Sequence, residues 1–344
     1  MARYTTLRLG GPAGRLETAT SAEEIVQKVQ EAESRDEAVL VLAGGSNVVI
    51  GDQGFPGTVV LIRSRGYRVV AEDAGTVTVR VEAGEPWDDL VAATVAQGWS
   101  GLECLSGVPG SAGATPIQNV GAYGQEVAET ITAVQAYDRT QRKVVLVAAA
   151  DCGFAYRGSI FKYSDRWVVL SVDFRLTRSP LSAPVRYAEL GRALGVEVGD
   201  RVPLADARAA VLRLRAGKGM VLDADDPDTW SVGSFFTNPV LEREAYEVLR
   251  ERAADLGEPP SWPCPGDRVK LSAAWLIDKA GFGKGYAGPE GVAISSKHTL
   301  ALTNRSGTAR TADLVALARE IRDGVHDRFA VTLHPEPVLI NCVI

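Results

Sequence analysis

The chain has 344 residues, 46% of them hydrophobic and 23% charged, so we expect a globular protein of two or three domains and exclude a disordered one. Its formal net charge of −6, without a lysine- or arginine-rich block, excludes nucleic acid as an expected partner. Because no apolar run approaches the ~18 residues that cross a bilayer and the first residues lack a signal-peptide core, we expect no membrane partner and a cytoplasmic location.

The first 66 residues predict a small unit of strands around one helix. Ser21 and Glu24 form a capping box, and apolar residues then recur at helical spacing, which predicts a helix over 22–34. Three apolar runs predict strands, at 38–43, 48–50 and 58–62. We expect these elements to form one βαββ unit.

Residues 67–217 predict a second domain that mixes strands and helices. Alternating apolar and polar residues at 67–83 predict an antiparallel hairpin, and Pro86 suits the first turn of a helix that carries Trp87. Further strands are expected at 131–137, 143–148 and 167–176. Scattered prolines predict an irregular excursion over 178–202, before a helix at 204–216.

The last third of the chain predicts another mixed domain. Helices are expected at 241–255, 273–280 and 311–326, and strands near 292–303. The sequence EPPSWPCPGD, at 258–267, predicts a proline-rich turn. Weak alternation at 331–343 predicts a strand that returns to the first part of the chain.

The sequence lacks several motifs that would assign another chemistry. Cys104, Cys152, Cys264 and Cys342 lie far apart without a CxxC pair, so we expect reduced thiols and neither a metal site nor disulfides. No HExxH, GxSxG or Walker A motif occurs. These absences disfavour a metalloprotease, an α/β-hydrolase and a P-loop enzyme.

The stretch 101–124 is unusually rich in glycine, with six in 24 residues against 35 in the whole chain. Glycine permits positive φ and close approach of the main chain, which suits a loop wrapped against a flat or phosphorylated ligand. Polar residues between the glycines could hydrogen-bond a heterocycle: Ser106, Ser111, Thr115, Gln118 and Asn119. From these residues alone, a glycine-rich loop closed on itself explains the stretch equally well.

Three further segments hold polar residues in settings that suggest catalysis. Ser234 lies between a glycine and two phenylalanines, Arg157 lies among aromatic residues, and Glu336 is fixed between two prolines. Taken singly, each has a structural interpretation that explains it better: a turn cap, a surface cation and a solvated turn residue. Only their combination points to a reaction.

Seven motifs together resemble those of the UDP-N-acetylenolpyruvoylglucosamine reductase family, flavoenzymes of peptidoglycan precursor synthesis. They are TLRLGGPA (6–13), LAGGSNVVI (42–50), GLECLSGVPGSAGATPIQNVGAYGQEV (101–127), YRGSIFK (156–162), GSFFTNP (233–239), AAWLIDKAG (273–281) and HPEP (334–337). Two positions depart from the family pattern. Thr5 stands where many members carry asparagine, and the arginine that others have two residues after Glu336 is missing.

The resemblance implies an α+β fold in which a two-domain FAD-binding fold of the vanillyl-alcohol-oxidase type is joined by a third α+β domain that binds substrate. Residues 1–66 would form the first part of the FAD-binding fold, to which 330–344 returns. Residues 67–217 would form its second part, with a lid loop at 178–202, and 218–329 the substrate-binding domain. We expect a monomer whose partners are small molecules.

The same resemblance assigns the cofactor, which is non-covalent FAD with NADPH as co-substrate and no metal. Gly44, Gly45, Ser46 and Asn47 would wrap the FAD pyrophosphate, and residues 116–119 would flank the isoalloxazine. Further cofactor-binding residues come from the glycine-rich stretch: Gly107, Pro109, Gly110, Gly113, Gln118, Asn119, Gly121 and Gly124.

The family reaction gives each unusual residue a role. Reduced flavin would pass hydride to C3 of the enolpyruvyl ether of UDP-N-acetylglucosamine, and Arg157 and Glu336 would stabilise the resulting enolate-like carboxylate. Ser234 would donate a proton to C2, which completes the lactyl ether. The UDP-sugar would be bound by Tyr187, Arg215, Lys218 and Asn238.

Two other functions fit parts of this pattern. A related flavoprotein oxidase of alcohols or hydroxy acids would share the cofactor motifs, but it would not need the proton donor in GSFFTNP or the carboxylate in HPEP. A non-catalytic UDP-sugar-binding protein that keeps the fold would be colourless and could not be reconstituted with FAD.

Overall fold

The structure is a computed structural model that describes all 344 residues. The chain forms two compact units, each made of non-consecutive segments. The C-terminal unit comprises residues 1–12, 46–55 and 222–344, and the central unit comprises 13–45 and 56–221. Residues of the expected first part, 1–66, are therefore shared between the two units. The expected division into three domains remains a prediction.

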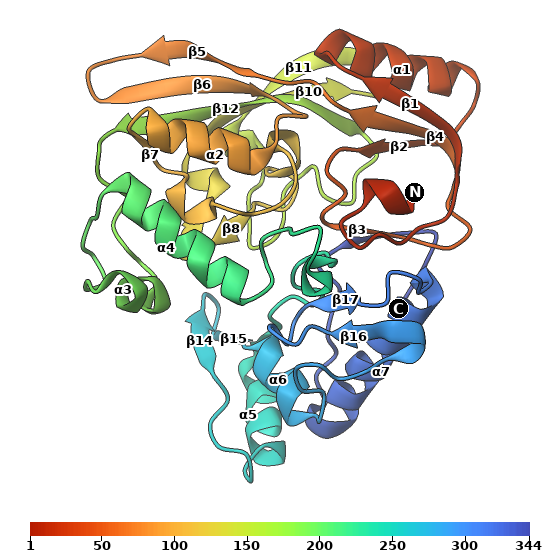
Figure 1. The fold of residues 1–344 in the computed structure, drawn as a ribbon, viewed down its shortest axis with the longest axis vertical. Coiled ribbons are helices and arrows are strands. Elements are labelled where there is room, and N and C mark those ends of the chain that lie inside the picture. The colour runs from red at the N-terminus through yellow and green to blue at the C-terminus, as the bar shows by residue number, and fades with distance from the viewer. The chain divides into compact units, whose positions relative to one another are not determined.

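The central unit is built on a six-stranded sheet with α2 (Trp87–Ala96) on one face (Figure 1). Val77, Val79 and Val81 alternate along β6 and are fully buried, as expected for a strand with one face on the core. The predicted hairpin and the three further strands are confirmed. In spatial order the strands are β11 (Lys143–Ala148), β10 (Ile131–Asp138), β12 (Trp167–Arg178), β6 (Thr76–Glu82) and β5 (Tyr67–Glu72), with β7 (Trp99–Ser100) paired to β12.

A smaller sheet joins β1 (Ala13–Ala19), β4 (Phe55–Ile62) and β2 (Val39–Leu42), in the order β1-β4-β2. The predicted helix is α1 (Ala22–Ser34), and the Ser21 hydroxyl accepts a hydrogen bond from the Glu24 amide at 3.2 Å. The sequence did not reveal β1, because only Ala19 in that strand is buried and no apolar alternation marks it.

The expected βαββ unit is wrong in one strand. Residues 48–50 form β3 (Val48–Ile50), but β3 pairs in parallel with β18 (Val338–Ile340) and not with β2 or β4. The tail therefore does lie beside a strand of residues 1–66. Local periodicity predicts that a strand exists, but it carries no information on so distant a partner.

The segment 178–202 is more ordered than expected, because it contains the helix α3 (Ala188–Leu194). Leu190 of α3 and Val185 pack with Ala210 and Val211 of α4 (Leu204–Gly217) in a separate hydrophobic cluster that also includes Cys104. The prediction of an irregular excursion is wrong at 188–194. A seven-residue helix with an internal glycine gives almost no helical signal in a sequence.

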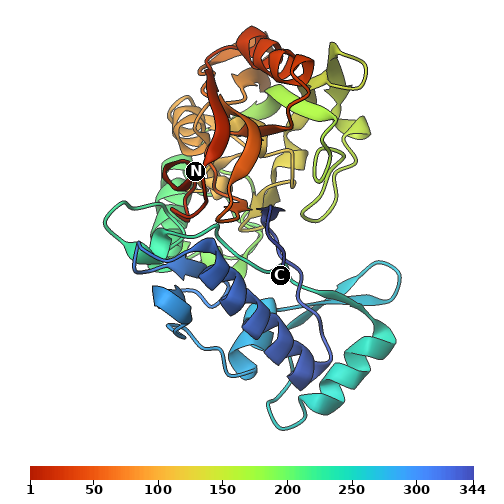
Figure 2. The same cartoon turned by 90° about the vertical axis from the view of Figure 1, so that its right-hand side faces the viewer.

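The C-terminal unit packs its helices around two small antiparallel sheets (Figure 2). The long helix α7 (Thr311–Phe329) contacts α5, α6 and both strands of the β16–β17 pair. The prediction of a proline-rich turn over 258–267 is wrong in part, because this segment includes the strand β14 (Ser261–Cys264). The remaining elements are β13 (Val240–Glu242), α5 (Arg243–Arg252), β14 (Ser261–Cys264), β15 (Arg268–Leu271), α6 (Ala273–Lys279), β16 (Val292–Ile294) and β17 (Leu302–Asn304).

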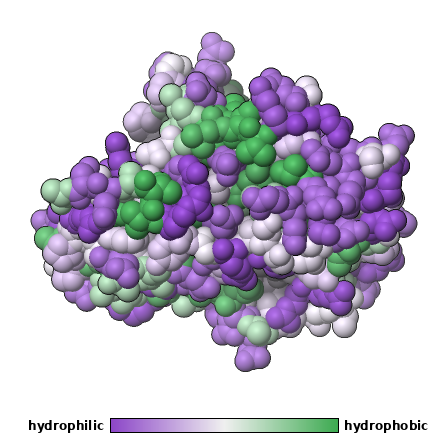
Figure 3. Space-filling view, turned by 90° about the horizontal axis from the view of Figure 1, so that it is seen from above, coloured by the Kyte–Doolittle hydropathy of each residue, from purple (hydrophilic) through white to green (hydrophobic).

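Both edge strands of the larger sheet carry exposed apolar side chains. Val144 and Leu146 on β11 are 46% and 60% exposed, and Val69 and Val70 on β5 are 44% and 41% exposed. Figure 3, which views the molecule from above Figure 1, shows such apolar patches in green among hydrophilic residues in purple. None of the helices has both the length and the apolar character that a membrane span requires.

Candidate active site

The glycine-rich stretch of the central unit consists of turns, two short 3-10 helices and the strand β8 (Gly121–Ala122), and its course depends on its glycines. Gly107, Gly110 and Gly124 have φ of 71°, 120° and 80°, which side chains rarely adopt. The amide of Gly107 donates to Asp88 Oδ1 at 2.6 Å, and Arg208 of α4 holds the same carboxylate through both oxygens. These contacts, together with desolvation that opposes them, leave the pKa of Asp88 below its usual value.

Two segments that were predicted to bind FAD lie against each other. A Cβ on Gly44 would be 2.8 Å from Cα of Gly110, so the two main chains touch. A Cβ on Gly113 would be 2.5 Å from Cβ of Ala83, and the Gly113 amide donates to the Ala83 carbonyl at 2.9 Å. The main chains can approach this closely only without side chains. Gly44 is exposed and Gly110 is half-buried, so these two main chains form a backbone cradle that fits the flat, phosphorylated FAD, whereas Gly113 is buried against Ala83.

The turn after β2 is the point where the chain passes between its two units. Gly44 and Gly45 belong to the central unit, whereas Ser46 and Asn47 belong to the C-terminal unit. Gly45 has φ of 61°, and the Asn47 carbonyl accepts a hydrogen bond from the Val338 amide at 3.0 Å. These residues remain the predicted pyrophosphate site, as do Pro109 and Gln118 for the rest of the cofactor.

Asn119 has a structural task that the sequence did not suggest. Its Nδ2 donates to Glu126 Oε2 at 2.8 Å and to the Ala155 carbonyl at 3.2 Å. Its Oδ1 accepts from the Ala128 amide at 3.1 Å. Both amide hydrogens are thus used within the protein, so any contact between Asn119 and a flavin would have to involve its main chain or its remaining lone pair.

Arg157 is held beside this stretch by a tight turn. It has φ of 53°, and residues 155 and 158 form an isolated antiparallel bridge around it. Its Nη2 donates to the Gly121 carbonyl at 3.1 Å, and Lys162 Nζ donates to the Arg157 carbonyl at 3.1 Å. The structure therefore brings Arg157 to the glycine-rich stretch, as the sequence could not foresee.

Three of the predicted substrate residues gather around Tyr123 in the central unit. The rings of Tyr123 and Tyr187 meet edge to face at 5.6 Å, and Lys218 Nζ lies 5.7 Å from the Tyr123 centroid. Arg215 Nη2 donates to the Met220 carbonyl at 2.8 Å, whereas its Nε is buried without a hydrogen-bond partner.

Burial shifts the ionisation of two groups in this cluster. It raises the pKa of Tyr123 to about 12 and lowers the pKa of Arg215. Tyr123 therefore remains a neutral phenol at neutral pH. No substrate role was predicted for Tyr123. It lies in an irregular segment, where no periodic pattern in the sequence could have indicated such a role.

In the C-terminal unit, Ser234 and Glu336 are brought together by a short ladder. The Glu336 amide donates to the Phe235 carbonyl at 2.8 Å, and the Phe235 amide donates to the Leu300 carbonyl at 2.7 Å. Ser234 itself is bridged to Ala301. The GSFFTNP and HPEP motifs, about a hundred residues apart, are thus joined through their main chains, together with the segment before β17.

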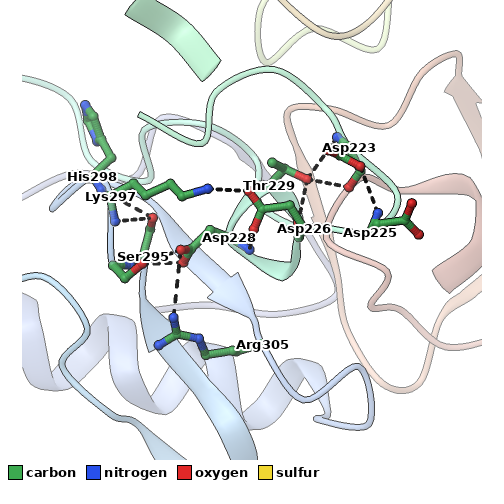
Figure 4. Close-up of polar contacts among 10 residues, drawn as sticks. Asp223, Asp225, Asp226, Asp228, Thr229, Ser295, Lys297, His298 and Arg305 are labelled. Atoms are coloured by element: carbon green, nitrogen blue, oxygen red, sulfur yellow. Dashed lines mark hydrogen bonds and ion pairs between the residues drawn. The ribbon is translucent and has the colours of Figure 1, made fainter. Parts of the chain in front are cut away.

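The segment 295–301 beside Ser234 is fixed by buried charge (Figure 4). Asp228, which is 5% exposed, accepts from the Ser296 amide at 3.0 Å and from its hydroxyl, and Lys297 pairs with Asp226. Arg305 Nη2 approaches Asp228 at 3.8 Å. This network was not predicted, although the acidic run at 223–228 is a signal for it in the sequence.

The remaining predicted residues are divided between the two units, and Asn238 also has a structural contact. Asn238 Oδ1 accepts from the Ala273 amide at 2.9 Å and so caps α6, which is a structural use of the side chain. The central unit contains Arg157, Tyr187, Arg215 and Lys218. The C-terminal unit contains Ser234, Asn238 and Glu336.

Family models match most of the chain in two parts. Residues 15–145 match the FAD binding domain, and residues 225–340 match the C-terminal domain of UDP-N-acetylenolpyruvoylglucosamine reductase. The first match confirms that the central unit contains a flavin-binding fold. The second match favours the reductase over the oxidase alternative.

Two relatives and one solved structure are similar to this chain over nearly its full length. The chain is 76% identical to the UDP-N-acetylenolpyruvoylglucosamine reductase of Salinispora arenicola, over 100% of this chain and 95% of the relative. It is 58% identical to that of Streptomyces coelicolor, over 100% and 90%. A crystal structure of the reductase from Thermus caldophilus covers 98% of this chain and 96% of its own, with a TM-score of 0.67 and 25% identity.

These matches extend across both units and include every motif on which the resemblance was based. The cofactor cradle and the paired Ser234 and Glu336 segments lie within them. The chain belongs to the UDP-N-acetylenolpyruvoylglucosamine reductase family and is an FAD-dependent oxidoreductase.

Proposed function

We infer that this chain reduces the enolpyruvyl ether of UDP-N-acetylglucosamine to UDP-N-acetylmuramate with electrons from NADPH, in peptidoglycan precursor synthesis. When bound, FAD would supply hydride chemistry between NADPH and the substrate. The backbone cradle of Gly44 and Gly110 would hold that cofactor. The family membership and this cradle support the proposal.

The charge that hydride transfer creates on the substrate is stabilised by Arg157 and Glu336 and is then neutralised by a proton from Ser234. Hydride at C3 leaves carbanion character at C2 beside a carboxylate, and this charge must be stabilised. Arg157 offers a permanent positive charge to the carboxylate, and Glu336 a hydrogen bond or shared proton. Ser234 donates the proton that C2 requires. The observation that supports the joint role of Ser234 and Glu336 is the ladder that joins their segments, and the role of Arg157 rests on the family motif.

An anaerobic titration tests the proposed reaction. NADPH should bleach the flavin absorbance, and the enolpyruvyl substrate should restore it with formation of the lactyl ether. A flavin that NADPH bleaches but the substrate does not reoxidise would contradict the substrate assignment. A protein that cannot be reconstituted with FAD would contradict the enzyme itself.

The flavin should be released when the protein is precipitated with acid, because its attachment is non-covalent. In this superfamily covalent attachment uses histidine, cysteine or tyrosine, and the cofactor stretch offers only Cys104 and Tyr123. Burial raises the pKa of each to about 12, so neither is a ready nucleophile at neutral pH. Flavin absorbance that stays with the pellet would refute this prediction.

The segment 178–202 acts as a lid over the substrate diphosphate, and Tyr187 is its contact. Tyr187 is 47% exposed and packs on Tyr123 next to Lys218. Asn238 contributes from the C-terminal unit, through the amide nitrogen that does not cap α6.

Tyr187→Phe should weaken substrate binding severalfold, since it removes one hydrogen bond, which is typically worth about 0.5–1.5 kcal/mol. NADPH oxidation should change little because the tyrosine has no role in flavin reduction. Stopped-flow measurement of the two half-reactions separates the effects. Equal change in both half-reactions, or in neither, would remove the lid assignment.

The proposed enzyme acts in the cytoplasm as a monomer, with small molecules as its only partners. Sugar nucleotides and NADPH are cytoplasmic metabolites, so the chemistry itself supports this location. We also propose that the chain is organised in three parts. Residues 1–66 and 67–217 would bind FAD, residues 218–329 would bind substrate, and residues 330–344 would return to the first part.

A further inference from the structure

Lys218, which the proposed function assigns to the substrate diphosphate, already has an anionic partner. Its Nζ donates to Glu189 Oε2 at 2.6 Å, and the two side chains are 33% and 31% exposed. Glu189 lies in the first turn of α3, two residues after Tyr187. The same segment that carries the lid tyrosine thus also supplies a carboxylate to the predicted diphosphate site.

The surroundings of this ion pair suit a larger anion than one carboxylate. Arg215 has a buried Nε without a hydrogen-bond partner and interacts electrostatically with Tyr123. Lys218 lies over the face of the Tyr123 ring. Glu189 pairs with Lys218. Asp88, which Arg208 already holds, interacts with Arg215. Three cations against two carboxylates leave positive charge that a diphosphate can neutralise.

We propose that Glu189 competes with the substrate diphosphate for Lys218 and thereby sets the affinity for the sugar nucleotide. This inference rests on the proposed function, which places the diphosphate at Lys218. A carboxylate and a phosphate are both acceptors for an ammonium, so the incoming diphosphate must take the place of Glu189. The product keeps the same diphosphate, so the returning carboxylate also promotes product release.

The size of the effect follows from the exposure of the pair. An ion pair that is about one-third exposed is partly screened by solvent and is worth a modest amount. Removing the competitor should therefore tighten binding by about 2- to 5-fold and not by orders of magnitude.

Glu129, which pairs with the lid residue Arg186, provides a matched control. Both of its oxygens accept from Arg186 Nη1 at 2.8 Å, and Arg186 also donates to the Gly124 carbonyl. Glu129→Gln therefore removes one negative charge and loosens the lid, as Glu189→Gln does, but it leaves Lys218 paired. A difference between the two variants reports on Lys218 and not on net charge or lid mobility.

The test is calorimetric titration of the FAD-loaded protein with UDP. Glu189→Gln should lower the Kd for UDP by about 2- to 5-fold, and Glu129→Gln should leave it unchanged. In a Lys218→Met background, Glu189→Gln should no longer tighten binding. Unchanged or weaker binding in Glu189→Gln would overturn the proposal, because Glu189 would then only position Lys218.

Three further outcomes would also overturn it: equal tightening in both glutamine variants, tightening that persists without the Lys218 ammonium, and no binding of UDP by the unaltered protein. Flavin reoxidation by the enolpyruvyl substrate is read separately. A protein that reduces this substrate but shows no effect of Glu189→Gln keeps the proposed function and loses only this inference.

Discussion

Replacing Ser234 with alanine should slow reoxidation of the reduced flavin by the enolpyruvyl substrate about 10²–10⁴-fold, the usual contribution of a general acid. Flavin bleaching by NADPH should keep its normal rate, because that step needs no proton at substrate C2. The Glu336 amide and the Leu300 carbonyl hold the neighbouring Phe235 through its main chain, so removing the serine hydroxyl leaves the ladder intact. Rapid mixing of each half-reaction measures the two rates.

Two variants sharpen this result. Ser234→Cys should recover part of the activity, since a thiol can donate a proton from a similar position. Thr237→Val removes a hydroxyl from the same motif, one that makes only a 3.4 Å contact with the His334 carbonyl, and should leave both rates near normal. If both half-reactions slow equally in Ser234→Ala, or if that variant stays active, the serine only shapes a turn.

Gly44→Ala should raise the Kd for FAD by roughly 10- to 100-fold, which corresponds to the 1–3 kcal/mol that overpacking usually costs. The added Cβ would lie 2.8 Å from Cα of Gly110, and neither main chain can rotate away as a side chain could. The two halves of the cofactor cradle must then separate. Fluorescence titration of the apoprotein with FAD measures the change.

Gly75→Ala is the matched control for this prediction. Gly75 lies in the same unit, does not need a positive φ, and has no atom closer than Asp73 Oδ1 at 3.8 Å to an added Cβ. This variant should bind FAD normally. Normal FAD affinity in Gly44→Ala would show that the two main chains can separate at little cost or that the cofactor binds elsewhere.

Local features of the fold could be predicted well from the sequence. The capping box at Ser21 gave the first residue of α1, and alternation gave the hairpin of β5 and β6. Both signals depend on neighbours within a few residues, so the sequence states them directly. β1 was missed because its burial does not alternate.

Long-range pairing could not be predicted in the same way. Nothing near β3 in the sequence indicates that β18 is its partner. No periodicity shows that the Glu336 amide hydrogen-bonds to the Phe235 carbonyl. The roles of Ser234, Arg157 and Glu336 came from the family motifs. Glu189 and Asp228 were missed because each acts through a residue that is distant in sequence.

The discontinuous C-terminal unit has a consequence for synthesis on the ribosome. Residues 1–12 and 46–55 leave the ribosome first but belong to a unit that is completed only when β18 emerges at 338–340. The central unit, whose sequence is complete at 221, can bury its own core much earlier. Until β18 emerges, β3 is an apolar strand without its partner, and its unpaired main-chain N–H and C=O groups form an edge to which other nascent chains can add.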